Sequence, residues 1–227
     1  MTTRRSGPIC PARLTKIDDL TRPDHLYLEG ADECFYFGDY CARQGFGYSP
    51  MNQLIYNFKK PMDRRGQPDW VYKEQAIERA AAAFAEALPQ DFCDRALFVA
   101  MPPSKARDDA GYDDRVFRLV QRLGALKPCH VHDLLRQEGS RDVAAHQGQR
   151  LDADTLAGML RVEALPGGAA PGIIGLFDDV LVTGASFKAA KSVLGATYPG
   201  VRVVGLYIAR RVFPPMEENF VVIGEDL

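Results

Sequence analysis

The chain contains few cysteines, and they form no closely spaced pair. Five cysteines in 227 residues are an odd number at irregular spacing, which predicts reduced thiols in a cytoplasmic protein. Cys10, His25, Cys34 and Cys41 could supply four zinc ligands, but no C-x2-C pair is present. We therefore favour ordinary thiols over a zinc site and predict no metal ligands from the protein itself.

Long hydrophobic runs and an excess of charge of one sign are also missing. No stretch approaches the ~18 consecutive apolar residues that a membrane helix needs, and residues 1–8 lack the apolar core of a secretory signal. Lys and Arg number 28 against 30 Asp and Glu, so the whole chain has no basic field for duplex DNA. These absences favour a cytoplasmic protein with no membrane partner.

The chain does contain enough apolar residues for a core, and its pattern changes near residue 70. Hydrophobic residues are 46% of 227, as expected for one domain with an added lobe. Residues 34–37 alternate like a strand, and residues 53–58 suit a short strand or a helical turn. We expect residues 1–70 to form a separate N-terminal lobe or hood and residues 71–227 to form the core. The lobe ends in a basic cluster that we expect to be a solvated loop, with contact to a phosphate as the alternative: Lys59, Lys60, Arg64 and Arg65.

From residue 71 onward, helical and strand patterns alternate. Apolar spacing predicts a helix over 73–88 and another over 113–123 that ends at Gly124. Continuous apolar runs predict strands, and the remaining segments follow the same alternation: strands at 96–101, 129–134, 160–162, 173–177 and 201–209, and a helix at 186–198. Strands separated by helices predict an α/β fold with a mainly parallel twisted sheet and flanking helices.

The most informative segment is residues 173–186, where an apolar strand leads into two adjacent carboxylates. Asp178 and Asp179 are followed by a short loop and a helix that begins with small and hydroxyl residues at 183–186. In a parallel sheet, ligands bind at the carboxyl ends of the strands, where carboxylates can accept hydrogen bonds from a vicinal diol. A helix N-terminus favours a phosphate. We expect this loop to face solvent and to form part of a ribose-phosphate site.

This segment resembles the signature of type I phosphoribosyltransferases over about 13 consecutive residues. It departs from that signature in a bulky Phe177 and in Ser186 in place of a common Thr. The resemblance implies that Asp178 and Asp179 are the catalytic pair that holds the ribose hydroxyls of phosphoribosyl diphosphate (PRPP). It also implies a cradle for the 5′-phosphate made by Val182, Thr183, Gly184, Ala185 and Ser186.

Other segments fit the same family. The resemblance implies that Pro103, Ser104 and Lys105, after the 96–101 strand, bind the diphosphate. Residues 111–113 are similar to a stretch of the competence-associated ComF branch, although Ala110 stands where that branch has Arg. Two arginines in the polar segment before residue 160 are implied to belong to a flexible hood over the site: Arg136 and Arg150.

The resemblance implies a reaction in which a nitrogen nucleophile attacks C1 of the ribose and diphosphate leaves. Mg²⁺ would be held mainly through PRPP, so the family needs no metal cage made by the protein. The acceptor stays unidentified, with a nucleobase or a related heterocycle as the expected class. Two other readings stay open: a non-catalytic regulatory or effector protein that binds a nucleotide or nucleic acid, and a hydrolase of N-glycosidic bonds. A homodimer is an open alternative to a monomer.

Overall fold

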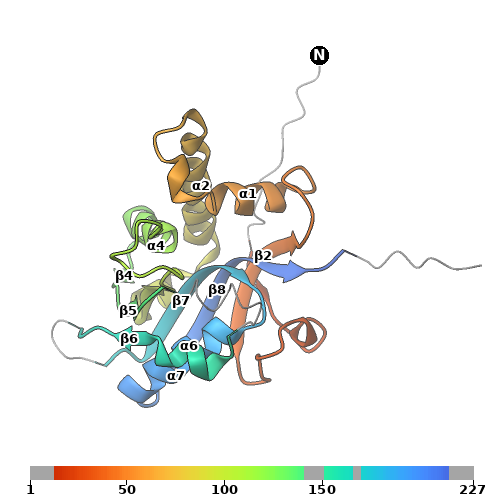
Figure 1. Ribbon diagram of the computed structural model, residues 1–227. Coiled ribbons are helices and arrows are strands. Elements are labelled where there is room, and N and C mark those ends of the chain that lie inside the picture. Colours follow the sequence, from red (N-terminus) through yellow and green to blue (C-terminus); the bar gives the residue numbers. More distant parts are fainter. Residues whose placement is uncertain (1–12, 141–150, 166–169, 215–227) are drawn as a thin grey trace, which may run out of the picture.

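The fold is built on a six-stranded sheet with the strand order β1-β2-β8-β7-β3-β4. The structure is a computed structural model that describes residues 13–140, 151–165 and 170–214 (Figure 1). All neighbouring strands run parallel except β1, which is antiparallel to β2. The strands are β1 Thr15–Lys16, β2 Glu33–Cys41, β3 Ala96–Ala100, β4 His130–Val131, β7 Ile173–Leu181 and β8 Arg202–Val212. The α/β class and the mainly parallel sheet are confirmed.

Helices cover both faces of this sheet (Figure 1). One face carries α1 Pro50–Phe58, α2 Val71–Ala87, α3 Gln90–Arg95 and α4 Arg115–Leu126, which share a core rich in Phe, Ala and Leu. The other face carries α6 Ala153–Gly158, α7 Ala185–Thr197 and the small sheet of β5 Leu135–Gln137 and β6 Leu160–Val162. Single 3-10 turns occur at Arg22–Asp24, Met62–Arg64 and Pro68–Trp70. No helix within the described ranges is long and apolar enough to cross a membrane.

The N-terminal segment contributes directly to the sheet, which corrects the expectation of a separate lobe. β2 lies between β1 and β8 and pairs with β8 from Glu33 to Cys41. The 53–58 stretch is helical and belongs to α1, which Ser49 caps by accepting the amide of Asn52. Because α1 packs against α2, while Ile17 and Leu28 pack into the cluster on the other face, the described part of residues 1–70 contributes to both cores of the chain.

Two of the boundaries that differ from the prediction have a clear structural reason. β7 continues to Leu181 because its last residues pair with β8, so both carboxylates lie within the strand and not after it. Helix α4 runs through Gly124, which we expected to end it. A Cβ at Gly124 would lie 3.1 Å from Cγ2 of Val131, so glycine here allows the helix to approach β4 closely.

The order of the strands identifies the edge where a ligand would bind. From β3 the chain crosses to β4 on one side, whereas β7 and β8 extend the sheet on the other side. The strand order therefore reverses between β3 and β7. The carboxyl ends of these two strands carry the two loops that the sequence analysis selected, after Ala100 and after Leu181.

Candidate functional site

The two adjacent carboxylates of β7 face different surroundings. Side chains alternate along a strand, and these two neighbours follow that rule. Asp178 lines a pocket of about 80 Å³ together with Tyr207 of β8 and the 180–187 segment that leads into α7. This volume exceeds the ~30 Å³ share of one water molecule. Asp178 is therefore open to a small ligand.

Asp179, by contrast, is buried and already paired with two cations. Lys59, which follows α1, places Nζ 3.2 Å from Oδ1 of Asp179. Arg115, the first residue of α4, donates from Nε at 3.0 Å and from Nη2 at 2.7 Å to Oδ2. The Lys59 side chain is 44% exposed and Arg115 is 19% exposed, so Lys59 is the more easily displaced of the two.

The ion pairs at Asp179 extend into a chain of buried charges. Nη1 of Arg115 lies 2.8 Å from Oδ2 of Asp113, and the same carboxylate accepts from Nζ of Lys73 at 2.6 Å. Lys73 is fully buried and also donates to the carbonyl of Lys60 at 2.7 Å. Charges of opposite sign thus alternate from α2, through the start of α4, to β7. Each buried charge thus has a partner of opposite sign, and burial of the same charge without a partner would cost free energy of folding.

These surroundings shift the pKa values of the two carboxyl groups in opposite directions. Burial, and then the charge of Asp179, raise the pKa of Asp178 to about 7. Burial also acts to raise the pKa of Asp179, but Lys59 and Arg115 outweigh it and lower the pKa to about 2. Asp179 is therefore the stronger acid of the two, and Asp178 keeps its proton to higher pH.

The loop after β7 presents the N-terminus of α7 to the same pocket. Gly184 has φ of +83°, a conformation that L-residues rarely adopt, and it precedes the first turn of this 13-residue helix. Five residues that the sequence analysis assigned to a phosphate cradle line the pocket together: Val182, Thr183, Gly184, Ala185 and Ser186. Their backbone is thus gathered at the positive end of the helix dipole.

This loop is covered on one side, which corrects the expectation that it faces solvent. A Cβ at Gly184 would lie 2.8 Å from the Leu28 side chain, and Gly184 is buried. The amide of Tyr27 donates to the carbonyl of Thr183 at 2.9 Å. Nδ1 of His25 donates to the carbonyl of Val182 at 2.6 Å. The segment before β2 therefore holds the loop in place, through contacts that local sequence does not reveal.

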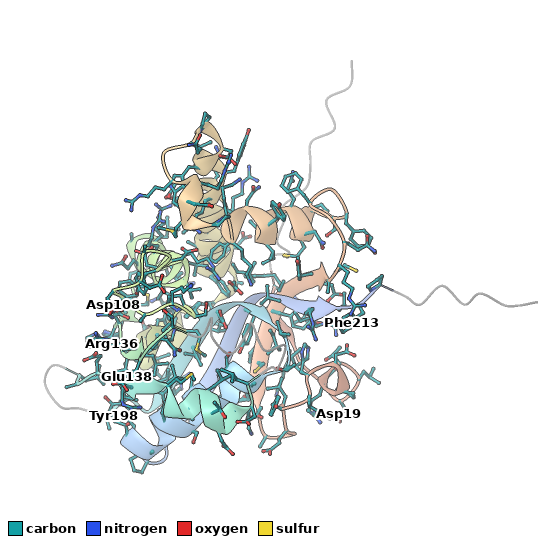
Figure 2. All side chains as sticks on the ribbon, viewed as in Figure 1. Asp19, Asp108, Arg136, Glu138, Tyr198 and Phe213 are labelled. Atoms are coloured by element: carbon teal, nitrogen blue, oxygen red, sulfur yellow. The ribbon has the colours of Figure 1, made fainter. Side chains whose placement is uncertain are left out.

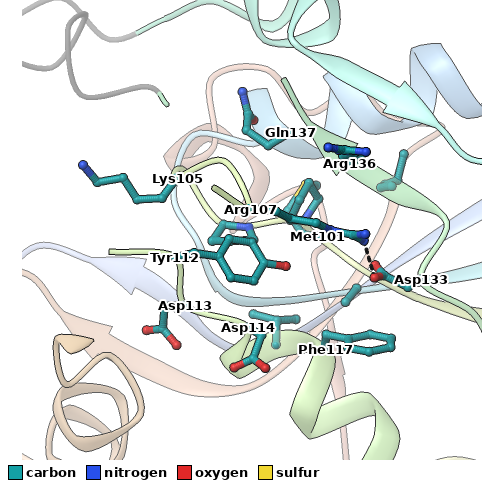
Figure 3. Close-up of a pocket in the computed structure, with 15 residues that line it drawn as sticks. Met101, Lys105, Arg107, Tyr112, Asp113, Asp114, Phe117, Asp133, Arg136 and Gln137 are labelled. Atoms are coloured by element: carbon teal, nitrogen blue, oxygen red, sulfur yellow. Dashed lines mark hydrogen bonds and ion pairs between the residues drawn. The ribbon is translucent and has the colours of Figure 1, made fainter. Parts of the chain in front are cut away.

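The loop after β3 forms a second, much smaller pocket of about 10 Å³ (Figure 3). Pro103, Lys105 and Arg136 line it, so three of the residues assigned to diphosphate binding or to the hood lie around one cavity. Ser104 is not among its lining residues, and Arg150 lies outside the described residues. This volume admits about one water, so a diphosphate there would need the loops to move apart.

Charged groups around the second pocket are engaged with one another. Nζ of Lys105 lies 3.6 Å from Oδ2 of Asp109, and Nη1 of Arg136 lies 3.7 Å from Oε1 of Glu163. Arg107 forms an ion pair with Asp133, drawn in Figure 3. These are partly exposed pairs, which contribute little to stability and can exchange for an anionic ligand.

Sequence reasoning missed Arg115 as a partner of the acidic pair and treated Lys59 only as one member of a basic cluster. The structure divides that cluster, because Lys60 and Arg64 pair with Asp69 while Lys59 alone reaches Asp179. Arg115 stands five residues after Ala110. Because Ala110 stands where the ComF branch has Arg, the nearby Arg115 was the signal in the sequence that could have indicated this partner.

The cysteines do not gather into a metal centre in the part of the chain that the structure describes. Cys34 and Cys41 are buried thiols, and Cys10 lies outside the described residues. No group of three or more His, Cys, Asp or Glu side chains suited to a metal occurs within those ranges.

Neither a protein-family model nor a curated protein matches this chain. Its function therefore has to be inferred from the geometry of the two pockets and from the charges between them. The pocket after β7 combines one accessible carboxylate with a helix N-terminus. That pairing suits a ligand that carries both hydroxyl groups and a phosphate.

Proposed function

We propose that the protein binds PRPP with Mg²⁺ and transfers its phosphoribosyl group to a nitrogen acceptor, releasing diphosphate. The observation that carries this proposal is the pocket shared by Asp178 and the 182–186 loop. It brings a carboxylate that can accept from a hydroxyl together with the N-terminus of a 13-residue helix, at the carboxyl end of β7, one of the two strands between which the strand order reverses. The type I phosphoribosyltransferase resemblance of the same residues supports the proposal.

The 5′-phosphate would bind against the backbone amides at the start of α7. Gly184 supplies the positive φ that turns the backbone into α7 and aims these amides at the pocket. The hydroxyl of Thr183 or of Ser186 would add a donor. Asp178 would accept from a ribose hydroxyl, and its ionised form would bind more strongly than its protonated form.

Asp179 has a different role in this proposal. Its charge is offset by Lys59 and Arg115, so it holds these two cations at the edge of the site. Lys59, being half-exposed, would shift to let a second ribose hydroxyl reach the carboxylate. The cations would then face the negative charge that develops on the leaving diphosphate.

In the proposed reaction, a nitrogen lone pair forms a bond to C1 of the ribose while the C1–oxygen bond to diphosphate breaks. Diphosphate leaves with that electron pair, and the nitrogen releases its proton to water. Mg²⁺ would supply charge neutralisation to the diphosphate, and an oxygen donor such as Asp178 fits its preference for hard ligands. Positioning and exclusion of water would be the protein's main contributions.

The proposal is tested by isothermal titration with PRPP and Mg²⁺, followed by a diphosphate-release screen over purines, pyrimidines, amides and small heterocycles. We expect binding by the wild type and diphosphate release with one nitrogen acceptor. We expect weaker binding by Asp178→Asn. Absence of PRPP binding by folded wild-type protein would contradict the proposal.

A second candidate function is binding without transfer, as in a regulatory protein. The observation that favours it is the full neutralisation of Asp179 by two cations, which leaves only one carboxylate open. It predicts that PRPP or a nucleotide binds but that no acceptor in the screen releases diphosphate. Release with any acceptor would exclude it.

A further inference from the structure

His25 is a buried histidine that has no part in the reaction as described so far. It follows the turn at Arg22–Asp24 and opens the stretch 25–28, which we call the covering segment because it covers the loop after β7. His25 is 1% exposed and lines neither pocket. Figure 2 places Asp19, shortly before this segment, on the opposite side of the view from Arg136 of the second pocket. The link between His25 and the site is therefore its contact with the loop.

The two nitrogens of this imidazole have different surroundings. A carbonyl oxygen can only accept, so the 2.6 Å contact with the carbonyl of Val182 requires the proton to be on Nδ1. Nε2 is buried and has no hydrogen-bond partner among the residues that the structure describes. Burial lowers the pKa of the His25 imidazole, which keeps the ring neutral near pH 7. Packing alone does not favour such a ring, because an unpaired buried nitrogen costs free energy of folding that an apolar side chain would not.

The contact with His25 fixes the direction of one peptide group in the loop. The C=O of Val182 and the N–H of Thr183 belong to the same planar trans peptide, so they point in opposite directions. The next peptide group follows the same rule, because the amide of Tyr27 donates to the carbonyl of Thr183 at 2.9 Å. The N–H groups of Thr183 and Gly184 therefore point away from the covering segment.

The pocket after β7 lies on the other side of this loop from the covering segment. All of residues 182–186 line the pocket, whereas residues 25–28, all of which the structure describes, do not. Neither the Thr183 amide nor the Gly184 amide has a hydrogen-bond acceptor within the described parts of the chain. Two unpaired donors at the N-terminus of α7 suit an anion that carries several acceptor oxygens.

We propose that His25 is a positioning residue: by donating from Nδ1 to the carbonyl of Val182, it turns the Thr183 amide toward the pocket, where this amide donates to the phosphate of the ligand. The identity of that phosphate, the 5′-phosphate of PRPP, rests on the proposed function. Among the described residues, no other side chain donates to a backbone carbonyl of the 182–186 loop. A donor whose direction is fixed before the ligand arrives needs no reorganisation on binding. Substitution of His25 therefore tests this contribution separately from the backbone contact of Tyr27.

The first test follows the Thr183 amide by NMR during titration of the wild type with ribose 5-phosphate. Val182–Thr183 is the only Val-Thr step in the sequence, so protein with carbonyl-¹³C Val and ¹⁵N Thr gives one correlated amide signal. We expect this amide proton to move downfield, because it donates to an anion. A long-range ¹H–¹⁵N spectrum should show the His25 proton on Nδ1. An unmoved Thr183 signal, a proton on Nε2, or absence of ribose 5-phosphate binding would each overturn the proposal.

The second test compares two substitutions of His25. The amide nitrogen of Asn is bonded to Cγ as Nδ1 of His is, so His25→Asn keeps a donor for Val182, whereas His25→Leu removes it. We expect His25→Leu to bind ribose 5-phosphate about tenfold more weakly than the wild type and to lose the downfield shift of Thr183. His25→Asn should stay close to the wild type in both measurements.

The matched control is His132→Leu. His132 also has a buried Nε2 without a partner in the described ranges, but it follows β4 at the far edge of the sheet. This variant should bind ribose 5-phosphate as the wild type does. A lower Tm of His25→Leu with unchanged affinity and an unchanged Thr183 shift would reduce His25 to a structural role and overturn the proposal. The wild-type spectra decide the question if His25→Leu does not fold.

Neither test uses PRPP or an acceptor, so the two proposals can fail separately. A Thr183 signal that responds to ribose 5-phosphate and depends on His25 supports the positioning role even if no acceptor releases diphosphate. Diphosphate release by a protein whose Thr183 signal does not respond would overturn the positioning role and leave the transferase in place.

Discussion

The two sides of β7 at its carboxyl end differ although they are one residue apart. On the side of α1 and α4, Asp179 is buried under Lys59 and Arg115, and Asp113 and Lys73 continue the charge chain. On the side of α7, Asp178 opens into a pocket with the N-terminus of a helix. The first side has its charges satisfied by the protein, whereas the second has room for a ligand.

This difference shows that two carboxylates that look equivalent in sequence can have separate roles. Replacing a member of the paired side should mainly affect folding, since a buried charge loses its partner. Replacing a member of the open side should affect ligand binding as well as stability. Substitutions can therefore separate the two sides, and the largest effect is expected at Arg115.

Arg115→Ala should cost roughly 3 kcal/mol of unfolding free energy, because Asp179 and Asp113 each lose a buried partner. Urea denaturation measures this. The control is Arg95→Ala, whose ion pair with Asp91 is exposed and should contribute less than ~1 kcal/mol. Equal losses in the two variants would mean that the buried charge chain does not stabilise the fold.

Gly184→Val should destabilise the protein by about 2–4 kcal/mol, because the new side chain meets Leu28 and the positive φ disfavours a β-branched residue. Gly200→Val is a close control: Gly200 has φ of +84° but no heavy atom within 4 Å of a Cβ. Thermal unfolding of both variants isolates the contribution of Leu28. If the two Tm values fall equally, Leu28 does not pack closely against Gly184.

Asp178→Asn should stabilise the protein at pH 8 and weaken PRPP binding about 10- to 100-fold. The folded-state pKa of about 7 lies above the ordinary value of 3.8, so the Asp178 carboxyl lowers stability as pH rises from about 4 to about 7. The amide removes that penalty, so the variant should gain stability relative to the wild type at pH 8 but not at pH 4. Denaturation at pH 4 and pH 8, with titration of PRPP, checks both effects. If the unfolding free energy has the same pH dependence in the variant and the wild type, the raised pKa of Asp178 is contradicted.

Lys105→Gln should have the smallest effect, about a fivefold loss of PRPP affinity with stability within ~0.5 kcal/mol of wild type. Lys105 is only partly buried, and its pair with Asp109 is 3.6 Å long. Titration of PRPP at low and at high salt measures the loss. A large fall in Tm would show that Lys105 has a structural role that its exposure does not suggest.

Elements with a strong local pattern were predicted well from sequence. The apolar spacing of 73–88 corresponds to α2, and the apolar run of 96–101 corresponds to β3. β2 was placed in a separate lobe because its role depends on pairing with β8, more than 160 residues further along the chain. The ends of β7 and α4 were also misplaced, because pairing with β8 and packing against Val131 override local stop signals.

The sequence by itself determined the α/β class, the order of most elements, and the segment that carries two acids and a glycine before a helix. Only the tertiary structure decided which acid is open, which cations hold the other, and that Leu28 covers Gly184. The reason is that burial and charge pairing depend on which distant elements meet. Lys59 lies 120 residues and Arg115 lies 64 residues from Asp179, so their contacts exist only once the sheet and its helices have assembled.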